Sequence, residues 1–247
     1  MSLRLDRALV ERGLARSRTH AQVSIRGGLV SVSGVVVTRP AFPVDDEPIE
    51  LSATDHYVSR AAHKLLGALA ATGLAIPRRV LDAGASTGGF TQVLLEAGAS
   101  RVYAVDVGHG QLAPGLRADP RVVVRERLNL RDLTLADLDG GPVGLVVGDV
   151  SFISLKLLLE PLFAVLEPGG SALLLVKPQF EVGRRGLDHH GVVRSDDLRT
   201  EAVAGVVEAA KALGWRASWQ GESRLPGESG NVEYFVHFVG ADVGGGG

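Results

Sequence analysis

The sequence contains no cysteine, one methionine and few aromatic residues, which make up 5% of its 247 positions. Without thiols the chain cannot form disulfides, bind a metal through thiolates or use a cysteine nucleophile. It has no uninterrupted run of about 18 apolar residues, so no membrane span is predicted. Its first residues, MSLRLDRALVERG, carry charges throughout and lack the apolar region of a secretory signal. These absences lead us to expect a soluble protein of the cytoplasm.

Charge is distributed unevenly along the chain. Residues 1–40 hold seven arginines and two acidic residues, whereas the remainder holds 19 basic and 26 acidic residues. A basic head on an acidic body indicates a polyanion-binding head, although a solvated arginine-rich helix face would give the same totals. Contacts with RNA phosphates would weaken steeply with salt. The side chains that we expect to make them are Arg4, Arg7, Arg18 and Arg26.

The first 57 residues predict a small α+β domain. Apolar spacing indicates helices within 4–14 and 17–28, the second capped by Ser17. Alternation over 29–37 predicts a hairpin that turns at Ser33-Gly34. Serine is a poor residue for a positive φ, so the turn type stays open. A linker is expected near residues 52–57.

From residue 58 to 240 the pattern changes to strand–helix alternation. Nearly continuous apolar strands are predicted at 78–85, 101–108, 121–130, 143–150 and 171–178. Helices are predicted at 87–98, at 154–170 with Pro161 tolerated, and at 196–215. Two last strands, 215–223 and 231–240, should be adjacent and antiparallel at one edge. This pattern predicts an α/β domain with a doubly wound, mostly parallel, seven-stranded Rossmann-like sheet, followed by a flexible glycine-rich tail at 241–247.

A glycine-rich loop after the first of these strands predicts a cofactor site. Glycines there allow a ligand to approach the backbone at the positive end of the next helix, although tight strand-to-helix packing could also explain them. The form D-x-G-x-x-x-G-G departs from the dinucleotide fingerprint G-x-G-x-x-G and fits S-adenosylmethionine better than NAD. Asp82 could bind its α-amino group and Asp106 its ribose hydroxyls. Asn129 could reach the adenine, or could be a turn cap. The predicted cofactor contacts are Asp82, Gly84, Ser86, Gly88, Gly89, Phe90, Asp106 and Asn129.

Charged side chains end two of the core strands. Asp149 follows the fourth strand and Lys177 follows the fifth, so both lie at the sheet edge that carries the cofactor loop. A buried salt bridge is the structural alternative, but it is an expensive way to hold a sheet. Lys64 and Glu233 are further candidates for the same site.

Two lysines and two carboxylates at one site suggest base catalysis. Burial and a neighbouring ammonium favour the neutral form of a lysine, which can then act as a general base. Its target would be a weak acid such as a hydroxyl, whose oxygen attacks the methyl group of a sulfonium. Lys177 is our hypothesis for the base, with Pro178 fixing the backbone just after it. No metal site is predicted, because His189-His190 lies in a polar loop.

Several motifs carry a resemblance to a known family. The head resembles the S4-like RNA-binding domain over RLDRALVERGLARSRTHAQVSIRGGLVSVSG. The body resembles the FtsJ-like ribose methyltransferases through YVSRAAHKL, LDAGASTGGF, DVSFISL, LVKPQFE and NVEYF. This order of domains resembles the TlyA family, whose members also carry the name haemolysin A. The similarity covers about residues 3–240.

The resemblance implies a class I methyltransferase that uses S-adenosylmethionine to methylate a ribose 2′-oxygen, usually of a cytidine in 16S or 23S ribosomal RNA or in both. It also implies a catalytic Lys-Asp-Lys-Glu tetrad, which maps onto Lys64, Asp149, Lys177 and Glu233. Ribosomal subunits would be the partners. The alternatives are a non-catalytic RNA-binding module, a membrane-active haemolysin, as the family's other name suggests, and an NAD-linked oxidoreductase.

Overall fold

The computed structural model describes residues 2–15, 17–51, 56–227 and 229–240. The chain divides into two compact units, Met1–His63 and Lys64–Gly247, which are described separately. Most of the expected linker and the whole of the expected tail, 52–55 and 241–247, lie outside the described residues. The division falls inside helix α3 (Ala61–Thr72), and the boundary after residue 57 stays a prediction.

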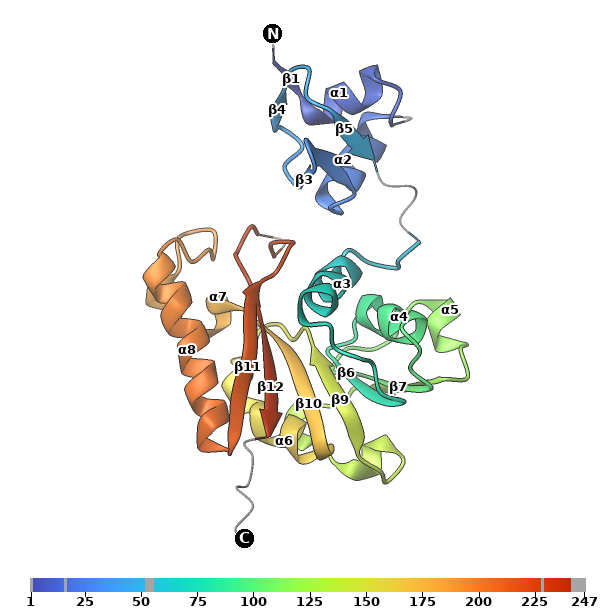
Figure 1. Cartoon of the computed structure of the whole chain (residues 1–247), viewed down its shortest axis with the longest axis vertical. Helices are drawn as coiled ribbons and strands as arrows, with labels where there is room; N and C mark the ends of the chain where they lie inside the picture. Colours follow the sequence, from blue (N-terminus) through green and yellow to red (C-terminus); the bar gives the residue numbers. More distant parts are fainter. Residues whose placement is uncertain (1, 16, 52–55, 228, 241–247) are drawn as a thin grey trace. The chain divides into compact units, whose positions relative to one another are not determined.

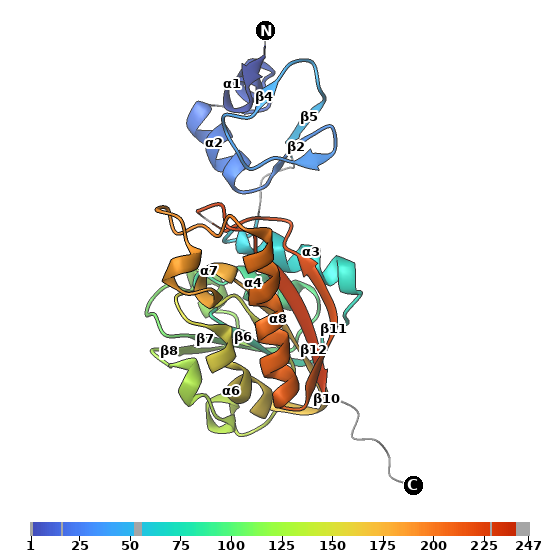
Figure 2. The same ribbon diagram turned by 90° about the vertical axis from the view of Figure 1, so that its left-hand side faces the viewer.

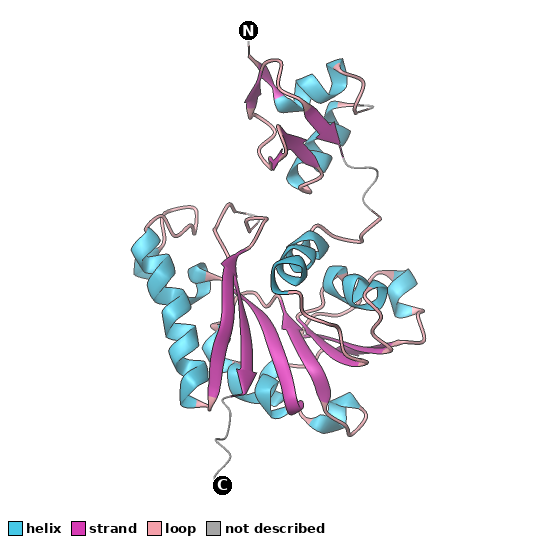
Figure 3. Cartoon of the chain, in the orientation of Figure 1, coloured by secondary structure: helices cyan, strands magenta, loops and turns pink. Residues whose placement is uncertain are grey.

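In its described residues up to Leu51, the first unit combines two helices with two small sheets, which can be followed in Figures 1 and 3. Its elements are β1 (Leu3–Arg4), α1 (Leu5–Glu11), α2 (Arg18–Arg26), β2 (Val30–Val32), β3 (Val35–Val36), β4 (Pro43–Val44) and β5 (Ile49–Leu51). Strand β1 pairs with β4, and the other three strands have the order β3-β2-β5. Ser17 caps α2 as expected, since its Oγ accepts from the backbone N–H of His20 at 3.1 Å.

The hairpin between β2 and β3 turns at the expected residues. Ser33 has φ 50° and Gly34 has φ 79°, so both central residues are left-handed. That is the backbone of a type I′ turn, which fits the twist of a two-residue hairpin. The sequence left the turn type open, and the structure shows type I′. Ser33 occupies a position in this turn where glycine or asparagine is usual.

The second unit is built on one seven-stranded sheet. Its strands are β6 (Arg79–Ala83), β7 (Arg101–Asp106), β8 (Val122–Glu126), β9 (Val143–Gly148), β10 (Leu166–Val176), β11 (Trp215–Glu222) and β12 (Tyr234–Gly240). Their order is β11-β12-β10-β9-β6-β7-β8. Strand β12 runs antiparallel to both of its neighbours, and the remaining adjacent pairs are parallel. The expected mostly parallel sheet with β11 and β12 at one edge is confirmed.

Helices cover both faces of this sheet, as Figure 2 shows. They are α3, α4 (Gly89–Glu96), α5 (Pro114–Arg117), α6 (Leu159–Ala164), α7 (Pro178–Glu181) and α8 (Asp196–Ala212), with 3₁₀ turns η1 (Leu130–Asp132), η2 (Leu135–Leu138), η3 (Leu155–Leu157) and η4 (Arg184–Gly186). Buried leucines, valines and aromatic rings of α6 and α8 form one core layer with the strands. On the other face, Phe90 of α4 stacks on Phe235 of β12. In the described part of the chain, no helix is long and apolar enough to cross a membrane.

The single helix expected over 154–170 is wrong. A 3₁₀ turn (η3) precedes α6, α6 ends at Ala164, and β10 begins at Leu166 and runs through Pro168-Gly169-Gly170. Pro161 is tolerated because it lies in the first turn of α6, where backbone N–H groups have no intrahelical acceptor. The pairing of β10 with β9 shifts register between Leu166 and Ser171, so the proline and glycines form an irregularity within a strand.

Candidate active site

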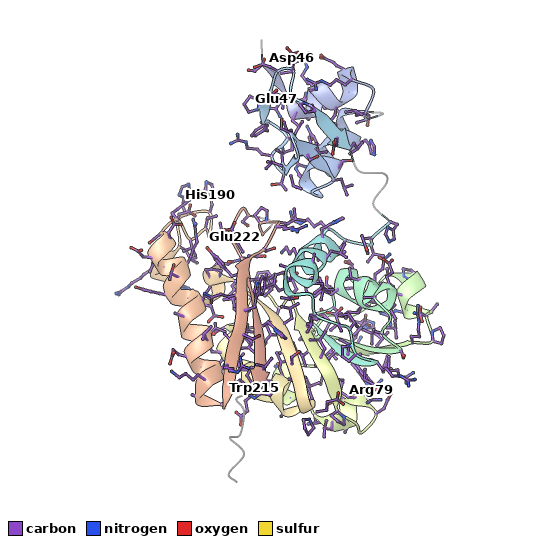
Figure 4. All side chains as sticks on the ribbon, viewed as in Figure 1. Asp46, Glu47, Arg79, His190, Trp215 and Glu222 are labelled. Atoms are coloured by element: carbon purple, nitrogen blue, oxygen red, sulfur yellow. The ribbon has the colours of Figure 1, made fainter. Side chains whose placement is uncertain are left out.

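The carboxyl ends of the parallel strands meet at one edge of the sheet. Figure 4 marks this edge by Glu222, at the end of β11, and the opposite edge by Arg79 and Trp215. Asp149 follows β9 and Lys177 follows β10, so their side chains leave neighbouring strand tips. Lys177 Nζ lies 2.6 Å from Asp149 Oδ1. The lysine at the end of a core strand therefore has a carboxylate partner on the next strand.

Two further charged residues extend this pair. Lys64, from α3, has its Nζ 2.6 Å from Glu233 Oε2 and 4.0 Å from Asp149 Oδ2. Glu233 immediately precedes β12 in the chain. Lys64, Lys177 and Glu233 are buried. The structure thus brings together all four residues of the expected tetrad as one chain of ion pairs.

Sequence reasoning missed two polar partners of this network. Lys177 Nζ donates a hydrogen bond to Ser151 Oγ at 2.6 Å, and Gln179 Nε2 donates to Glu233 Oε1 at 3.2 Å. Both belong to motifs quoted above, DVSF and KPQFE. The available signal was their position within two residues of a strand-tip charge.

The loop between β9 and η3 carries an unusual aromatic residue. Phe152 is 91% exposed and has φ 67°, which is rare for a bulky side chain. Its ring lies 5.4 Å from that of Phe180, centroid to centroid. Glu181 holds the far end of the loop, because its carboxylate accepts from Ser154 Oγ and from the backbone N–H of Leu155, each at 2.7 Å. Backbone strain at an exposed aromatic beside charged groups points to a functional surface.

Asp82 is the most perturbed acid of the site. It is buried at the end of β6, and its Oδ2 accepts from Thr91 Oγ1 at 2.6 Å. Its Oδ1 is buried with no hydrogen-bond partner among the described residues. Burial raises the pKa of Asp82 to about 7. An orphaned carboxylate oxygen next to a glycine-rich loop fits a ligand that brings a positive hydrogen-bond donor.

The glycine-rich loop is packed too closely for side chains at two points. Gly84 has φ 83°, and a Cβ there would lie 3.1 Å from the backbone oxygen of Asp149. Gly88, the residue before α4, has φ 99°, and a Cβ there would overlap the Leu116 side chain. Gly89 is the first residue of α4. Gly84 thus allows the loop to lie against the residues that follow β9, and Gly88 allows it to lie against Leu116 of α5.

Asp106 and Ser86 bind the loop together. The two Asp106 carboxylate oxygens accept from the backbone N–H groups of Ser86, at 2.8 Å, and Gly108, at 2.7 Å. Each carboxylate oxygen has a second acceptor position, so Asp106 could still accept ligand hydroxyls. Ser86 itself has φ 47° and donates through its Oγ to Gln111.

The two remaining cofactor candidates have structural roles. Phe90 is buried, with its ring centroid 6.2 Å from that of Phe235. Asn129 is exposed and caps η1, since its Oδ1 accepts from the backbone N–H of Arg131 at 3.1 Å. The turn cap left open by the sequence is therefore present, and cofactor contact by either residue stays a prediction.

Of the four arginines predicted to bind RNA, two contact the same carboxylate in the structure. Arg4 Nε lies 3.1 Å from Asp6 Oδ1 and Arg18 Nε lies 3.0 Å from Asp6 Oδ2, with Asp6 fully buried. Their guanidinium groups hold the pKa of Asp6 well below its usual range. Arg7 instead pairs with Glu11 at 3.7 Å along α1, and Arg26 is exposed. The structure thus joins Arg4 and Arg18 through one carboxylate.

An acidic run lies in the same unit. Arg12 donates to the backbone carbonyls of Asp45 and Glu47, the second at 2.6 Å. The Glu47 carboxylate accepts from the backbone N–H of Asp45 at 2.6 Å. The acidic run is thus held to Arg12, which follows α1, through its backbone carbonyls.

In the described parts of the chain, no group of three or more histidine, aspartate or glutamate side chains could hold a metal ion.

Comparisons with known proteins agree with this geometry. Residues 57–239 match the FtsJ-like methyltransferase family and residues 3–47 match the S4 domain. The 16S/23S rRNA (cytidine-2′-O)-methyltransferase TlyA of Mycobacterium tuberculosis is 51% identical, covering 94% of this chain and 88% of that protein. Hemolysin A of Brachyspira hyodysenteriae is 38% identical, covering 96% of this chain and 100% of that protein.

Solved structures show the same architecture. A Streptococcus thermophilus protein that carries a hemolysin name is 37% identical, with a TM-score of 0.75, covering 98% of this chain and 89% of that chain. An S-adenosylmethionine-dependent methyltransferase from Mesorhizobium loti shares the fold alone, at 17% identity and a TM-score of 0.52, covering 71% and 97%. The chain therefore belongs to the FtsJ-like methyltransferases and, within them, to the TlyA family with an S4 domain at the N-terminus, and its cofactor is S-adenosylmethionine.

Proposed function

We propose that this protein methylates the ribose 2′-oxygen of a cytidine in 16S ribosomal RNA, in 23S ribosomal RNA or in both, in the cytoplasm, with Lys177 as the general base. The observation that carries the proposal is the buried chain of ion pairs from Lys177 to Glu233 at the strand tips. The names of two relatives support the substrate. They are the mycobacterial protein described above and the 23S rRNA (cytidine-2′-O)-methyltransferase TlyA of Campylobacter jejuni, which is 39% identical over 74% of this chain and 71% of that protein.

The tetrad supplies what this reaction needs. A ribose hydroxyl is a weak acid, so a positioned base that removes its proton accelerates the attack of its oxygen. Lys177 is the candidate because its amine lies at the end of β10, and Asp149, 2.6 Å away, stabilises the ammonium that forms. Lys64 and Glu233 neutralise each other at 2.6 Å and keep Asp149 in place from the other side.

The chain's own residues also fit the cofactor. When bound, S-adenosylmethionine supplies an electrophilic methyl group on a sulfonium. The unpartnered Oδ1 of Asp82 would accept from its ammonium, and Asp106 would accept from its ribose hydroxyls. Gly84 and Gly88 keep the loop free of side chains that would crowd this edge.

Two surfaces would hold the RNA. The exposed ring of Phe152, three residues after Asp149, offers a stacking platform for an unstacked base beside the tetrad. In the S4 domain, Arg4 and Arg18 are 48% and 57% exposed while anchored to Asp6, so each keeps donors free for phosphates. Ribosomal RNA in assembled or partly assembled subunits would be the partner.

The test is transfer of labelled methyl from S-adenosylmethionine to purified, unmethylated 30S and 50S subunits. Lys177→Met should lower the rate by about 10²–10⁴, the usual contribution of a general base. Lys211→Met is the matched control, because Lys211 lies on α8 and is 71% exposed, and it should retain the full rate. A wild-type rate in Lys177→Met would remove the assignment of the base. No label on either subunit with wild-type protein that binds both RNA and cofactor would favour the non-catalytic module.

A further inference from the structure

The amine of Lys177 has two oxygen neighbours, one in an ion pair and one that accepts its hydrogen bond. Asp149 Oδ1 and Ser151 Oγ each lie 2.6 Å from Nζ. Lys177 is buried, whereas Ser151 is exposed. Ser151 is therefore a solvent-exposed residue whose hydroxyl contacts a buried amine, and RNA must approach that amine from solvent.

The chemistry of an amine gives these two contacts a function. A neutral lysine nitrogen is tetrahedral, with the Cε bond, two hydrogens and one lone pair. Ionised Asp149 can only accept hydrogen bonds, and Ser151 Oγ can accept as well. If both acceptors take a hydrogen, the lone pair has one direction left. A base works efficiently only when that direction meets the proton it removes.

We propose that Ser151 is a positioning residue that aims the Lys177 lone pair at the ribose 2′-hydroxyl. The proposal deepens the proposed function and rests on Lys177 as the base. The hydroxyl proton passes to Lys177 Nζ, the ribose oxygen takes the methyl group, and the electron pair of the broken carbon–sulfur bond stays on sulfur. Ser151 gains and loses no atom in this step. It fixes the geometry in which the proton moves.

The loop that carries Ser151 is held at both ends. At its start, the backbone N–H of Asp149 donates to the carbonyl of Ala83 in β6 at 3.1 Å. At its far end, the Glu181 carboxylate accepts from Ser154 and Leu155. Between them, Phe152 keeps a left-handed backbone. A loop fixed in this way can hold a hydroxyl in one place relative to the strand-tip lysine, as a precise site requires.

The test separates positioning from loop integrity in the full-length protein. Steady-state methyl transfer to subunits would be measured for Ser151→Ala, Ser151→Thr and Ser154→Ala. Ser151→Ala should lower kcat about tenfold or more, with KM for RNA and for cofactor within about twofold of wild type. Ser151→Thr restores a hydroxyl at the exposed position and should recover most of kcat. Ser154→Ala removes a hydroxyl from the same loop without touching Lys177, and the backbone N–H of Leu155 still donates to Glu181 and holds that end of the loop. It should therefore leave kcat within about twofold of wild type.

Each other outcome has a distinct meaning. A wild-type kcat in Ser151→Ala would overturn the proposal and indicate that the serine hydroxyl occupies the place that the ribose hydroxyl takes over. Equal losses in Ser151→Ala and Ser154→Ala, or no recovery with threonine, would also overturn it, in favour of a loop-folding role. Calorimetric titration with S-adenosylmethionine identifies any variant that has lost its fold. A fully active Lys177→Met would instead refute the proposed function, whatever the Ser151 variants do.

Discussion

Asp82→Asn should stabilise the methyltransferase domain at alkaline pH and weaken its binding of S-adenosylmethionine. Asp82 is buried at the end of β6 with Oδ1 unpartnered among the described residues. Burial raises its pKa from the ordinary 3.8 to about 7. The cofactor-free fold therefore carries a carboxyl group that ionises only at a cost, while the proposed ammonium contact needs the ionised form.

The sign and size of the change in the free energy of unfolding follow from the linkage between proton binding and folding. Because the folded pKa lies above the unfolded pKa, the folded state binds more protons between about pH 4 and 7, and the free energy of unfolding falls as pH rises through that window. A shift of about three pKa units corresponds to about 4 kcal/mol by pH 8. Asparagine escapes this cost, but it buries an amide N–H without an acceptor, which costs about 1–3 kcal/mol. The variant should therefore be about 1–3 kcal/mol more stable than wild type at pH 8, with no gain near pH 4.

The assay is urea unfolding of both proteins from pH 5 to 8, with calorimetric titration of the cofactor at pH 7.5. Asp46→Asn, in an exposed loop of the S4 domain, is the matched control and should follow the wild-type pH dependence. The stability difference between Asp82→Asn and wild type should widen as pH rises, while cofactor affinity falls at least tenfold. Parallel pH curves for the two proteins would refute the reasoning, and so would an unchanged cofactor affinity.

Three further substitutions test other parts of the structure. Asp6→Asn leaves Arg4 and Arg18 without their shared carboxylate and should cost about 2–3 kcal/mol in thermal unfolding of the S4 domain, with weaker RNA binding in a filter assay. Gly84→Ala forces a Cβ to a φ of 83° and to 3.1 Å from the Asp149 backbone, so it should cost at least about 1 kcal/mol and slow methyl transfer; a wild-type rate would contradict this. Phe152→Ala should raise KM for RNA about tenfold in steady-state kinetics while leaving cofactor affinity unchanged, because it removes an exposed stacking surface.

Most of the sheet could be predicted because its strands are nearly continuous apolar runs between turn residues. The exception is β10, where Leu166 to Gly170 reads locally as a helix end and yet forms part of a strand. Proline and glycine mark a break in regular structure, but the sequence alone does not say which element they interrupt. Here pairing with the neighbouring strand makes the segment part of β10, since β9 pairs with Leu166 before the irregularity and with Ser171 after it.

Two members of the tetrad, Asp149 and Lys177, could be anticipated because strand ends of a parallel sheet meet at one edge, whereas the roles of Lys64 and Glu233 followed from the family resemblance. That argument places Asp149 and Lys177 together without knowledge of any loop. It does not reach Ser151 or Phe152, whose positions depend on the path of the loop after β9. The partnership of Asp6 with Arg18 escaped prediction for a similar reason, because it joins residues twelve positions apart through the packing of α1 on α2.

The most direct measurement of the central claim is alkaline hydrolysis of ribosomal RNA labelled by the wild-type protein. Alkali cleaves RNA through a free 2′-hydroxyl, so a methyl group on that oxygen leaves an uncut dinucleotide. We expect the label in alkali-resistant dinucleotides with cytidine on the 5′ side, and at least about 100-fold less of it with Lys177→Met over the same reaction time. Label released in mononucleotides would place the methyl group on a base and contradict the role assigned to the strand-tip lysine.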